Sequence, residues 1–313
     1  VEPARVPRIS IGPQRKQWIL IGLALSLALG VGCALLLDFF DHTIRNIDDV
    51  SRHLQLPALA IIPTIAARRT RLLRGRRKEP LRLGPSITDA GQNGNGDDDS
   101  LALDGRSAAA EAYRLLRTSV TLSVPDRASR AILITSSQPG EGKTTTTVNT
   151  AISLAQLGSS VLIIDCDLRT PKVHSLLGTE QEPGLSTYLS QDVEIDDLIR
   201  KLKIPGLSLI PAGPIPHNPA ELLGSKRMKD LLEIMSKRYD HILIDSPPLI
   251  HLADPVILST LVDGVIMVVH GGKSTRDVVR RARQELSNVG AHVFGVVLNK
   301  VDARNTGYHA YKA

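Results

Sequence analysis

The sequence predicts an α/β fold of the P-loop NTPase class, in which a mostly parallel sheet carries helices on both faces. Short apolar runs alternate with helical patterns in the second half of the chain, as parallel strands joined by crossover helices do. A phosphate-binding pattern follows the first run, and two later runs end in aspartate. We expect strands at 131–136, 161–165, 207–210, 241–245, 264–269 and 292–298.

The phosphate-binding pattern is SSQPGEGKTTTT, which supplies most of a GxxxxGK[ST] loop but has Ser137 at the place of its first glycine. Glycines let the backbone approach phosphate oxygens, and the N-terminus of the helix expected near Lys143 adds a positive dipole. The lysine can reach the outer phosphates of ATP, and Thr144 can bind Mg²⁺. A Gly-rich turn without a ligand is the alternative. The residues predicted to contact ATP here are Gly140, Glu141, Gly142, Lys143, Thr144 and Thr145.

Three carboxylates follow the ends of two apolar runs, Asp165 and Asp167 in VLIIDCDLR and Asp245 in HILIDSPP. The carboxyl ends of parallel strands meet at one edge of a sheet, so these side chains are expected beside the phosphate loop. Such carboxylates can hold Mg²⁺ or accept a proton from an attacking hydroxyl. Any one of them alone is more often a helix N-cap or a turn residue, so the prediction depends on the set.

Composition limits the classes of function. Hydrophobic residues make up 42% of the 313 residues, enough for a sizeable core. Aromatic residues are only 3%, which excludes a nucleic-acid surface built on stacked rings despite the net charge of +6. The two cysteines, Cys33 and Cys166, have no CxxC spacing and indicate neither a disulfide framework nor a metal cluster. We expect no nucleic-acid partner.

An uncharged stretch of about 20 residues, the length that a helix needs to cross a bilayer, runs from Trp18 to Leu37. It predicts a transmembrane helix at 17–38, with a buried core helix as the alternative. Residues 1–16 then end an extracytoplasmic region of a longer protein. The nucleotide site needs cytoplasmic ATP, so everything after the span is placed inside.

Residues 39–106 are expected to form a juxtamembrane segment and linker. Its basic run at 68–78 is either solvated or attracted to anionic lipid headgroups. The stretch after Glu79 is rich in Gly, Asn, Asp and Ser and predicts a flexible tether. The compact P-loop domain is expected at 107–303, followed by a tail at 304–313.

These motifs resemble the bacterial protein tyrosine kinases that are fused to, or partnered with, polysaccharide co-polymerases of capsule and exopolysaccharide export. PGEGKTT, IIDCDLRTPKVH and LIDSPP look like the three nucleotide-site motifs of that family, and PGLSTYL (183–189) and AGPIPHNPAELLGSKRM (212–228) are similar to stretches that distinguish it. The related ATPases that position division sites or partition chromosomes carry a signature lysine early in the loop. Gln138 stands there instead.

The resemblance implies an ATP- and Mg²⁺-dependent protein tyrosine autokinase in a bacterial inner membrane, with a cytoplasmic kinase domain. In that reading Lys143 neutralises phosphate charge, and Thr144, Asp167 and Asp245 hold the metal. Asp165 is then the base for the tyrosine hydroxyl. The implied role is regulation of polysaccharide polymerisation and export. The implied partners are the polymerisation and export machinery and a cognate tyrosine phosphatase.

The resemblance also implies an assembly. The family's ExxRxxR helix, which mediates ring formation, is similar to Glu111, Arg114 and Arg117 here. The same spacing also fits an ordinary ion-pair face within one helix.

The tail and one strand end supply the remaining implied sites. Tyr308 and Tyr311 match the family's phosphorylated tail, although two tyrosines can also occur there by chance. Asn299 resembles the family's adenine contact, and the alternative is a cap at a strand end.

Two other functions stay open at this level. One is a non-catalytic ATP-binding regulator of polysaccharide chain length, and the other is a partitioning-type P-loop ATPase. Phosphorylation of the tail distinguishes the first from a kinase. The missing signature lysine and the apolar span disfavour the second.

Overall fold

The computed structural model describes residues 15–39, 43–64, 107–123 and 130–302, which fall into two compact units, 1–42 and 43–313. In the first unit the described element is helix α1 (Arg15–Phe39), whose described side chains are all exposed, among them Trp18 and Leu29. No helix within the described residues has the length and apolarity that a membrane crossing requires. The helix predicted at 17–38 is present, and its insertion in a membrane stays a prediction.

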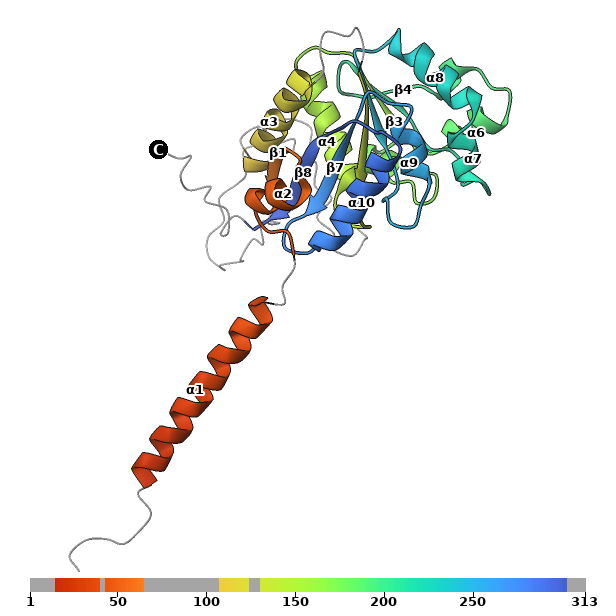
Figure 1. The fold of residues 1–313 in the computed structure, drawn as a ribbon. Coiled ribbons are helices and arrows are strands. Elements are labelled where there is room, and N and C mark those ends of the chain that lie inside the picture. Colours follow the sequence, from red (N-terminus) through yellow and green to blue (C-terminus); the bar gives the residue numbers. More distant parts are fainter. Residues whose placement is uncertain (1–14, 40–42, 65–106, 124–129, 303–313) are drawn as a thin grey trace, which may run out of the picture. The chain divides into compact units, whose positions relative to one another are not determined.

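In the second unit helices and strands alternate along the chain (Figure 1). The strands are β1 (Ala58–Pro63), β2 (Arg130–Ser136), β3 (Val161–Asp165), β4 (Arg200–Lys201), β5 (Leu207–Ile210), β6 (His241–Asp245), β7 (Gly264–His270) and β8 (Val293–Val301). The helices are α2 (Ile47–Leu54), α3 (Ala108–Ser123), α4 (Lys143–Ala155), α5 (Val173–Leu177), α6 (Leu185–Ser190), α7 (Pro219–Leu223), α8 (Lys226–Ser236), α9 (Asp254–Ser259) and α10 (Arg276–Asn288), with a 3₁₀ turn at Ile195–Leu198.

The described strands form one sheet in the order β1-β8-β7-β2-β6-β3-β5-β4. Every pairing is parallel except that of β4 with β5, which is antiparallel. The six strands predicted from the apolar runs are all present. The mostly parallel α/β fold is therefore confirmed.

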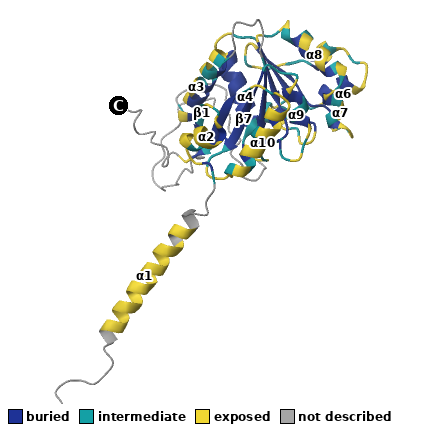
Figure 2. Cartoon of the chain, in the orientation of Figure 1, coloured by how far each residue is buried: buried dark blue, intermediate teal, exposed yellow. Residues whose placement is uncertain are grey.

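Two apolar cores lie on opposite faces of this sheet because side chains alternate along each strand. In β2, Ile132 and Ile134 face the core that contains α3 and α4, whereas Leu133 faces the core that contains α8 and α10. The strands are consequently buried on both faces (Figure 2). Helices cover both faces, as the runs of continuous apolar residues predicted.

Residues 43–64 belong to the P-loop unit, although the sequence reading placed them in the juxtamembrane segment and began the domain at 107. Strand β1 pairs with β8, and α2 contributes the buried side chains Val50 and Leu54 to the core. The run ALAIIP is too short to signal a strand without its partner, since β8 lies more than 200 residues away in the sequence. The compact unit of the structure thus includes residues before 107, while most of the expected linker, 65–106, lies outside the described residues.

Candidate active site

The phosphate loop connects β2, which ends at Ser136, to α4, which begins at Lys143. Gly140 and Gly142 have φ values of 80° and 93°, a left-handed conformation that side chains with a Cβ rarely adopt. Gly142 is also the N-cap of α4 and places no side chain over the helix end. The first-turn amides of this 13-residue helix thus lack a side-chain cap, which suits them to bind a phosphate.

The Glu141 side chain turns into the loop itself and not toward a ligand. It accepts hydrogen bonds from Ser137 Oγ at 2.8 Å and from the Gln138 amide at 2.8 Å, and Ser274 Oγ, from the segment after β7, also donates to it. Burial raises the pKa of Glu141, while these hydrogen bonds oppose the rise. The Glu141 side chain therefore braces the loop, and the contact of this residue with ATP stays a prediction.

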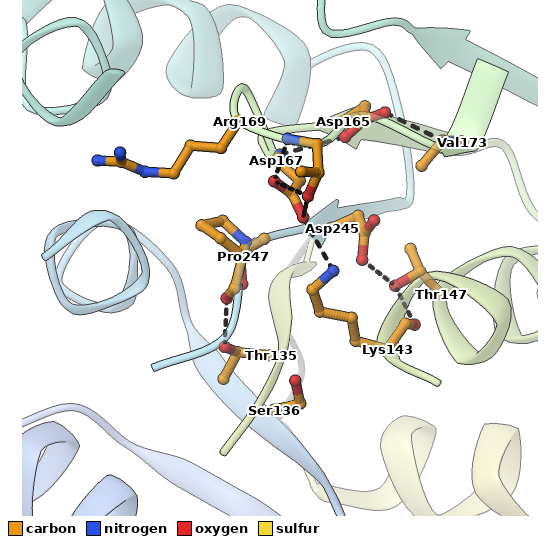
Figure 3. Close-up of polar contacts among 12 residues, drawn as sticks. Thr135, Ser136, Lys143, Thr147, Asp165, Asp167, Arg169, Val173, Asp245 and Pro247 are labelled. Carbon is orange, nitrogen blue, oxygen red and sulfur yellow. Dashed lines mark hydrogen bonds and ion pairs between the residues drawn. The ribbon is translucent and has the colours of Figure 1, made fainter. Parts of the chain in front are cut away.

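Lys143 and the three predicted aspartates meet at the carboxyl edge of the sheet. Asp165 and Asp245 are register partners on the neighbouring strands β3 and β6. Lys143 Nζ donates to Asp167 Oδ2 at 2.9 Å, and Figure 3 shows its side chain extending toward the carboxylates. The sequence prediction that the strand ends bring these acids to the phosphate loop is confirmed.

Burial and mutual repulsion shift the proton affinities of this cluster. Burial raises the pKa of Asp245 to about 6, against the opposing effect of Lys143. Burial, followed by the charges of Asp245 and Asp167, raises the pKa of Asp165 well above its usual value. Burial disfavours the charged ammonium of Lys143, but the neighbouring carboxylates outweigh it and raise the lysine pKa. The cluster is therefore short of positive charge and suited to a cation.

Both Asp165 oxygens already accept backbone hydrogen bonds. The Asp167 amide donates to Oδ1 at 3.1 Å, and the Val173 amide, at the start of α5, donates to Oδ2 at 3.2 Å. Asp165 thus shapes the loop between β3 and α5. A carboxylate has about four acceptor positions, so these two bonds leave it the capacity to accept a proton.

The residues expected to hold Mg²⁺ are only partly committed to protein contacts. Asp245 Oδ1 accepts a hydrogen bond from Thr147 Oγ1 at 3.3 Å, whereas its buried Oδ2 has no hydrogen-bond partner among the described residues. In that same part of the chain, no three or more His, Cys, Asp or Glu side chains form a metal site by themselves. The unpartnered Asp245 Oδ2 could serve as a ligand of Mg²⁺, which is usually bound by one or two carboxylates together with the phosphates of a nucleotide.

Comparisons with known proteins agree with this geometry. A family model described as an AAA domain matches residues 129–281. The tyrosine-protein kinase YwqD of Bacillus subtilis is 37% identical over 194 residues, which are 62% of this chain and 82% of that protein. The chain belongs to the bacterial tyrosine-protein kinases. The kinase domain of the Escherichia coli tyrosine kinase ETK superposes with a TM-score of 0.71 at 31% identity, covering 83% of this chain and 96% of that one.

The family predicted from the motifs, and the tyrosine kinase class of its P-loop domain, are confirmed by these kinases. Some relatives are much longer. The tyrosine-protein kinase ptk of Acinetobacter johnsonii is 29% identical over 310 residues, 98% of this chain but 40% of its own length. The chain thus spans about two fifths of that protein.

In this kinase Asn299 lies against the phosphate loop. Its Nδ2 donates to the Glu141 carbonyl at 2.9 Å, and its Oδ1 accepts from the Lys300 amide at 2.9 Å. A Cβ on Gly142 would approach Asn299 Nδ2 to 2.1 Å, so the two residues are closely packed. Asn299 therefore supports the loop from β8, and its contact with adenine stays a prediction.

The residues expected to form a ring make contacts within one subunit. Glu111 and Arg114 are an ion pair on α3, with 2.6 Å between Oε2 and Nη1. Arg117 Nη1 donates to the Ser153 carbonyl of α4 at 3.0 Å. These contacts match the intrahelical alternative in part and leave the ring untested. The predicted acceptors Tyr308 and Tyr311 lie outside the described residues.

Three residues that the sequence reading left without a role lie at the site. Ser274 contacts the phosphate loop through its hydrogen bond to Glu141, and no local sequence pattern predicts this contact. Arg169 belongs to the quoted motif IIDCDLRTPKVH and forms an ion pair with the buried Asp254. The motif could have indicated a role for Arg169. Its partner Asp254 lies 85 residues away and could not be identified from the motif.

Proposed function

We propose that this chain is the cytoplasmic kinase end of a membrane-anchored tyrosine autokinase, which phosphorylates its own tail across neighbouring subunits. One observation carries the proposal: Lys143, at the start of α4, lies beside three buried carboxylates, Asp165, Asp167 and Asp245, at the carboxyl edge of the sheet. This arrangement combines a phosphate loop, metal ligands and a proton acceptor, which are the parts that phosphoryl transfer needs.

Each residue has a distinct part in the proposed reaction. The first-turn amides of α4 and the Lys143 ammonium bind the phosphates of ATP. Thr144, Asp167 and Asp245 hold Mg²⁺, which neutralises charge on the transferred phosphoryl group when bound. Asp165, whose pKa is raised by burial and by its acidic neighbours, accepts the proton of the tyrosine hydroxyl.

The anchor is assigned to α1. This 25-residue helix exposes its described apolar side chains, and such a surface is stable in lipid but not in water. We place α1 in the inner membrane with the kinase domain in the cytoplasm. The wider role is control of polysaccharide polymerisation and export through that machinery, opposed by a tyrosine phosphatase.

The ring is assigned to the helix that carries Glu111, Arg114 and Arg117. Two exposed apolar side chains, Leu115 and Leu122, lie on the same helix and support an interface there. Tyr308 and Tyr311 are the proposed acceptors, each reaching the Asp165 of a neighbouring subunit. Phosphates on the tails would repel one another and loosen the ring.

The test is incubation of the full chain with ATP and Mg²⁺, followed by mass spectrometry of its C-terminal peptide. Phosphate is expected on Tyr308, Tyr311 or both, and Lys143→Met should abolish it. The double change of both tyrosines to Phe controls for other acceptors. An unphosphorylated wild-type tail would favour a non-catalytic ATP-binding regulator, and strong stimulation of ATP hydrolysis by DNA would favour a partitioning-type ATPase.

A further inference from the structure

Arg169 and Asp254 form a forked ion pair that has no part in the reaction described above. Arg169 Nε donates to Asp254 Oδ2 at 2.7 Å, and Nη2 donates to Oδ1 at 3.0 Å. The Asp254 side chain is fully buried, whereas that of Arg169 is 40% exposed. Removing the partner of a buried carboxylate is costly, so this forked pair ties its two elements together.

The ion pair connects the two loops that bring the aspartates to the site. Arg169 lies two residues after Asp167, in the loop between β3 and α5. Asp254 is the first residue of α9, the helix that follows β6 and Asp245. Figure 3 shows Arg169 extending from the Asp167 loop on the side away from Lys143. The guanidinium therefore acts on the loop and not on the lysine.

The position of the Asp167 carboxylate depends on this loop. Asp167 Oδ1 accepts from the Thr170 amide at 3.0 Å and from Thr170 Oγ1 at 3.2 Å, while Oδ2 accepts from Lys143 at 2.9 Å. Residues 167–170 thus form a turn closed on the Asp167 carboxylate, and Arg169 is part of that turn. An interaction that fixes the position of Arg169 therefore also fixes the position of the Asp167 carboxylate.

We propose that Arg169 is a positioning residue, whose ion pair with Asp254 fixes the 167–170 turn against α9 and aims the Asp167 carboxylate at Mg²⁺. The proposal rests on the proposed function for the identity of the metal. Lysine cannot replace the arginine fully, because a single ammonium cannot make two parallel hydrogen bonds to one carboxylate.

The test measures Mg²⁺-dependent binding of a fluorescent ATP analogue to the full chain, so that it does not depend on phosphoryl transfer. In Arg169→Met the Mg²⁺ concentration for half-maximal enhancement of binding should rise roughly tenfold, as loss of a residue that orients a metal ligand typically does. Binding of the analogue in EDTA should stay at the wild-type level, because the phosphate loop is intact. Arg169→Lys should fall between Arg169→Met and wild type.

A matched control is Arg238→Met, which removes an exposed Arg238–Asp196 pair near the start of β6, the end of the strand opposite to Asp245. It should leave the Mg²⁺ dependence unchanged. Wild-type Mg²⁺ dependence in Arg169→Met, or an equal loss of binding with and without Mg²⁺, would overturn the proposal. If Arg169→Met does not fold, Arg169→Lys decides the question by the same two measurements. A wild-type chain that binds Mg²⁺ and nucleotide but phosphorylates no tyrosine would refute the proposed function and leave this inference standing.

Discussion

Asp245→Asn should stabilise the nucleotide-free protein while removing its activity. Asp245 is fully buried, and burial raises its pKa from 3.8 to about 6. The folded chain therefore holds a proton on Asp245 more tightly than the unfolded chain does. The sign follows directly: stability falls as the pH rises from about 4 to about 6 and stays at the lower level above that window.

The magnitude follows from the size of this shift. A rise of about 2 pKa units corresponds to about 3 kcal/mol at 1.36 kcal/mol per unit. Solvent screening does not reduce it, because the side chain is fully buried. Asparagine can still accept the hydrogen bond from Thr147, but its amide group adds a buried donor that costs about 1 kcal/mol. The net gain is about 2 kcal/mol at pH 7.5, and near pH 4 it becomes a small loss.

Urea unfolding followed by far-UV circular dichroism in EDTA, at several pH values from 4.5 to 8, measures this difference. Asp240→Asn is the matched control with the opposite sign. Backbone and side-chain hydrogen bonds from Ser160 lower the pKa of Asp240, so its carboxylate stabilises the fold above the unfolded pKa. The control should lose stability by about the same amount at pH 4.5 and at pH 8, because the lowered pKa of Asp240 lies below that range.

Two results would refute the reasoning about Asp245. One is a variant that is less stable than wild type at pH 7.5. The other is a stability difference that is the same at pH 4.5 and pH 7.5, because a proton-linked effect must change across that window.

Changes at three further residues test the loop and α3. Gly142→Ala forces a Cβ into a left-handed residue and against Asn299, at a strain of about 1–3 kcal/mol, so nucleotide affinity measured by fluorescence titration should fall by about fivefold or more. Wild-type affinity would contradict the close packing. Glu141→Gln should cost less than about 1 kcal/mol in urea unfolding, and Glu141→Ala about 2 kcal/mol, because alanine leaves buried donors without an acceptor; equal costs would contradict the bracing role. Arg117→Ala removes the bond to Ser153 and should lower stability by about 1 kcal/mol. An unchanged unfolding midpoint would show that this contact is not stabilising.

The elements that the sequence predicted well are those whose signals are local. The run AILITS, the glycines after it and the threonines of α4 are adjacent in the chain, so the strand, loop and helix follow from periodicity and turn chemistry. The aspartates at the ends of β3 and β6 were placed correctly for the same reason. Parallel strands all point the same way, and a residue at a strand end needs no further information to reach the edge of the sheet.

The elements that it missed depend on contacts between distant segments. Strand β1 is defined by pairing with β8, and its six residues carry too little pattern to stand alone. Arg169 can be recognised as part of its motif, but only the fold shows that its ion-pair partner is Asp254. Glu141 belongs to the phosphate loop by spacing, but its long-range contact with Ser274 is visible only in the fold.

The sequence by itself determined the fold class, the phosphate loop and the three carboxylates, because strand period, glycine conformation and strand polarity are properties of short segments. Only the tertiary structure decided what each polar side chain does. The contact of Glu141 with Ser274 and the ion pair that anchors the Asp167 turn join residues far apart in the chain. Burial then raises the pKa of Asp245, since the free energy of a charge depends on all of its neighbours and not on its place in the sequence.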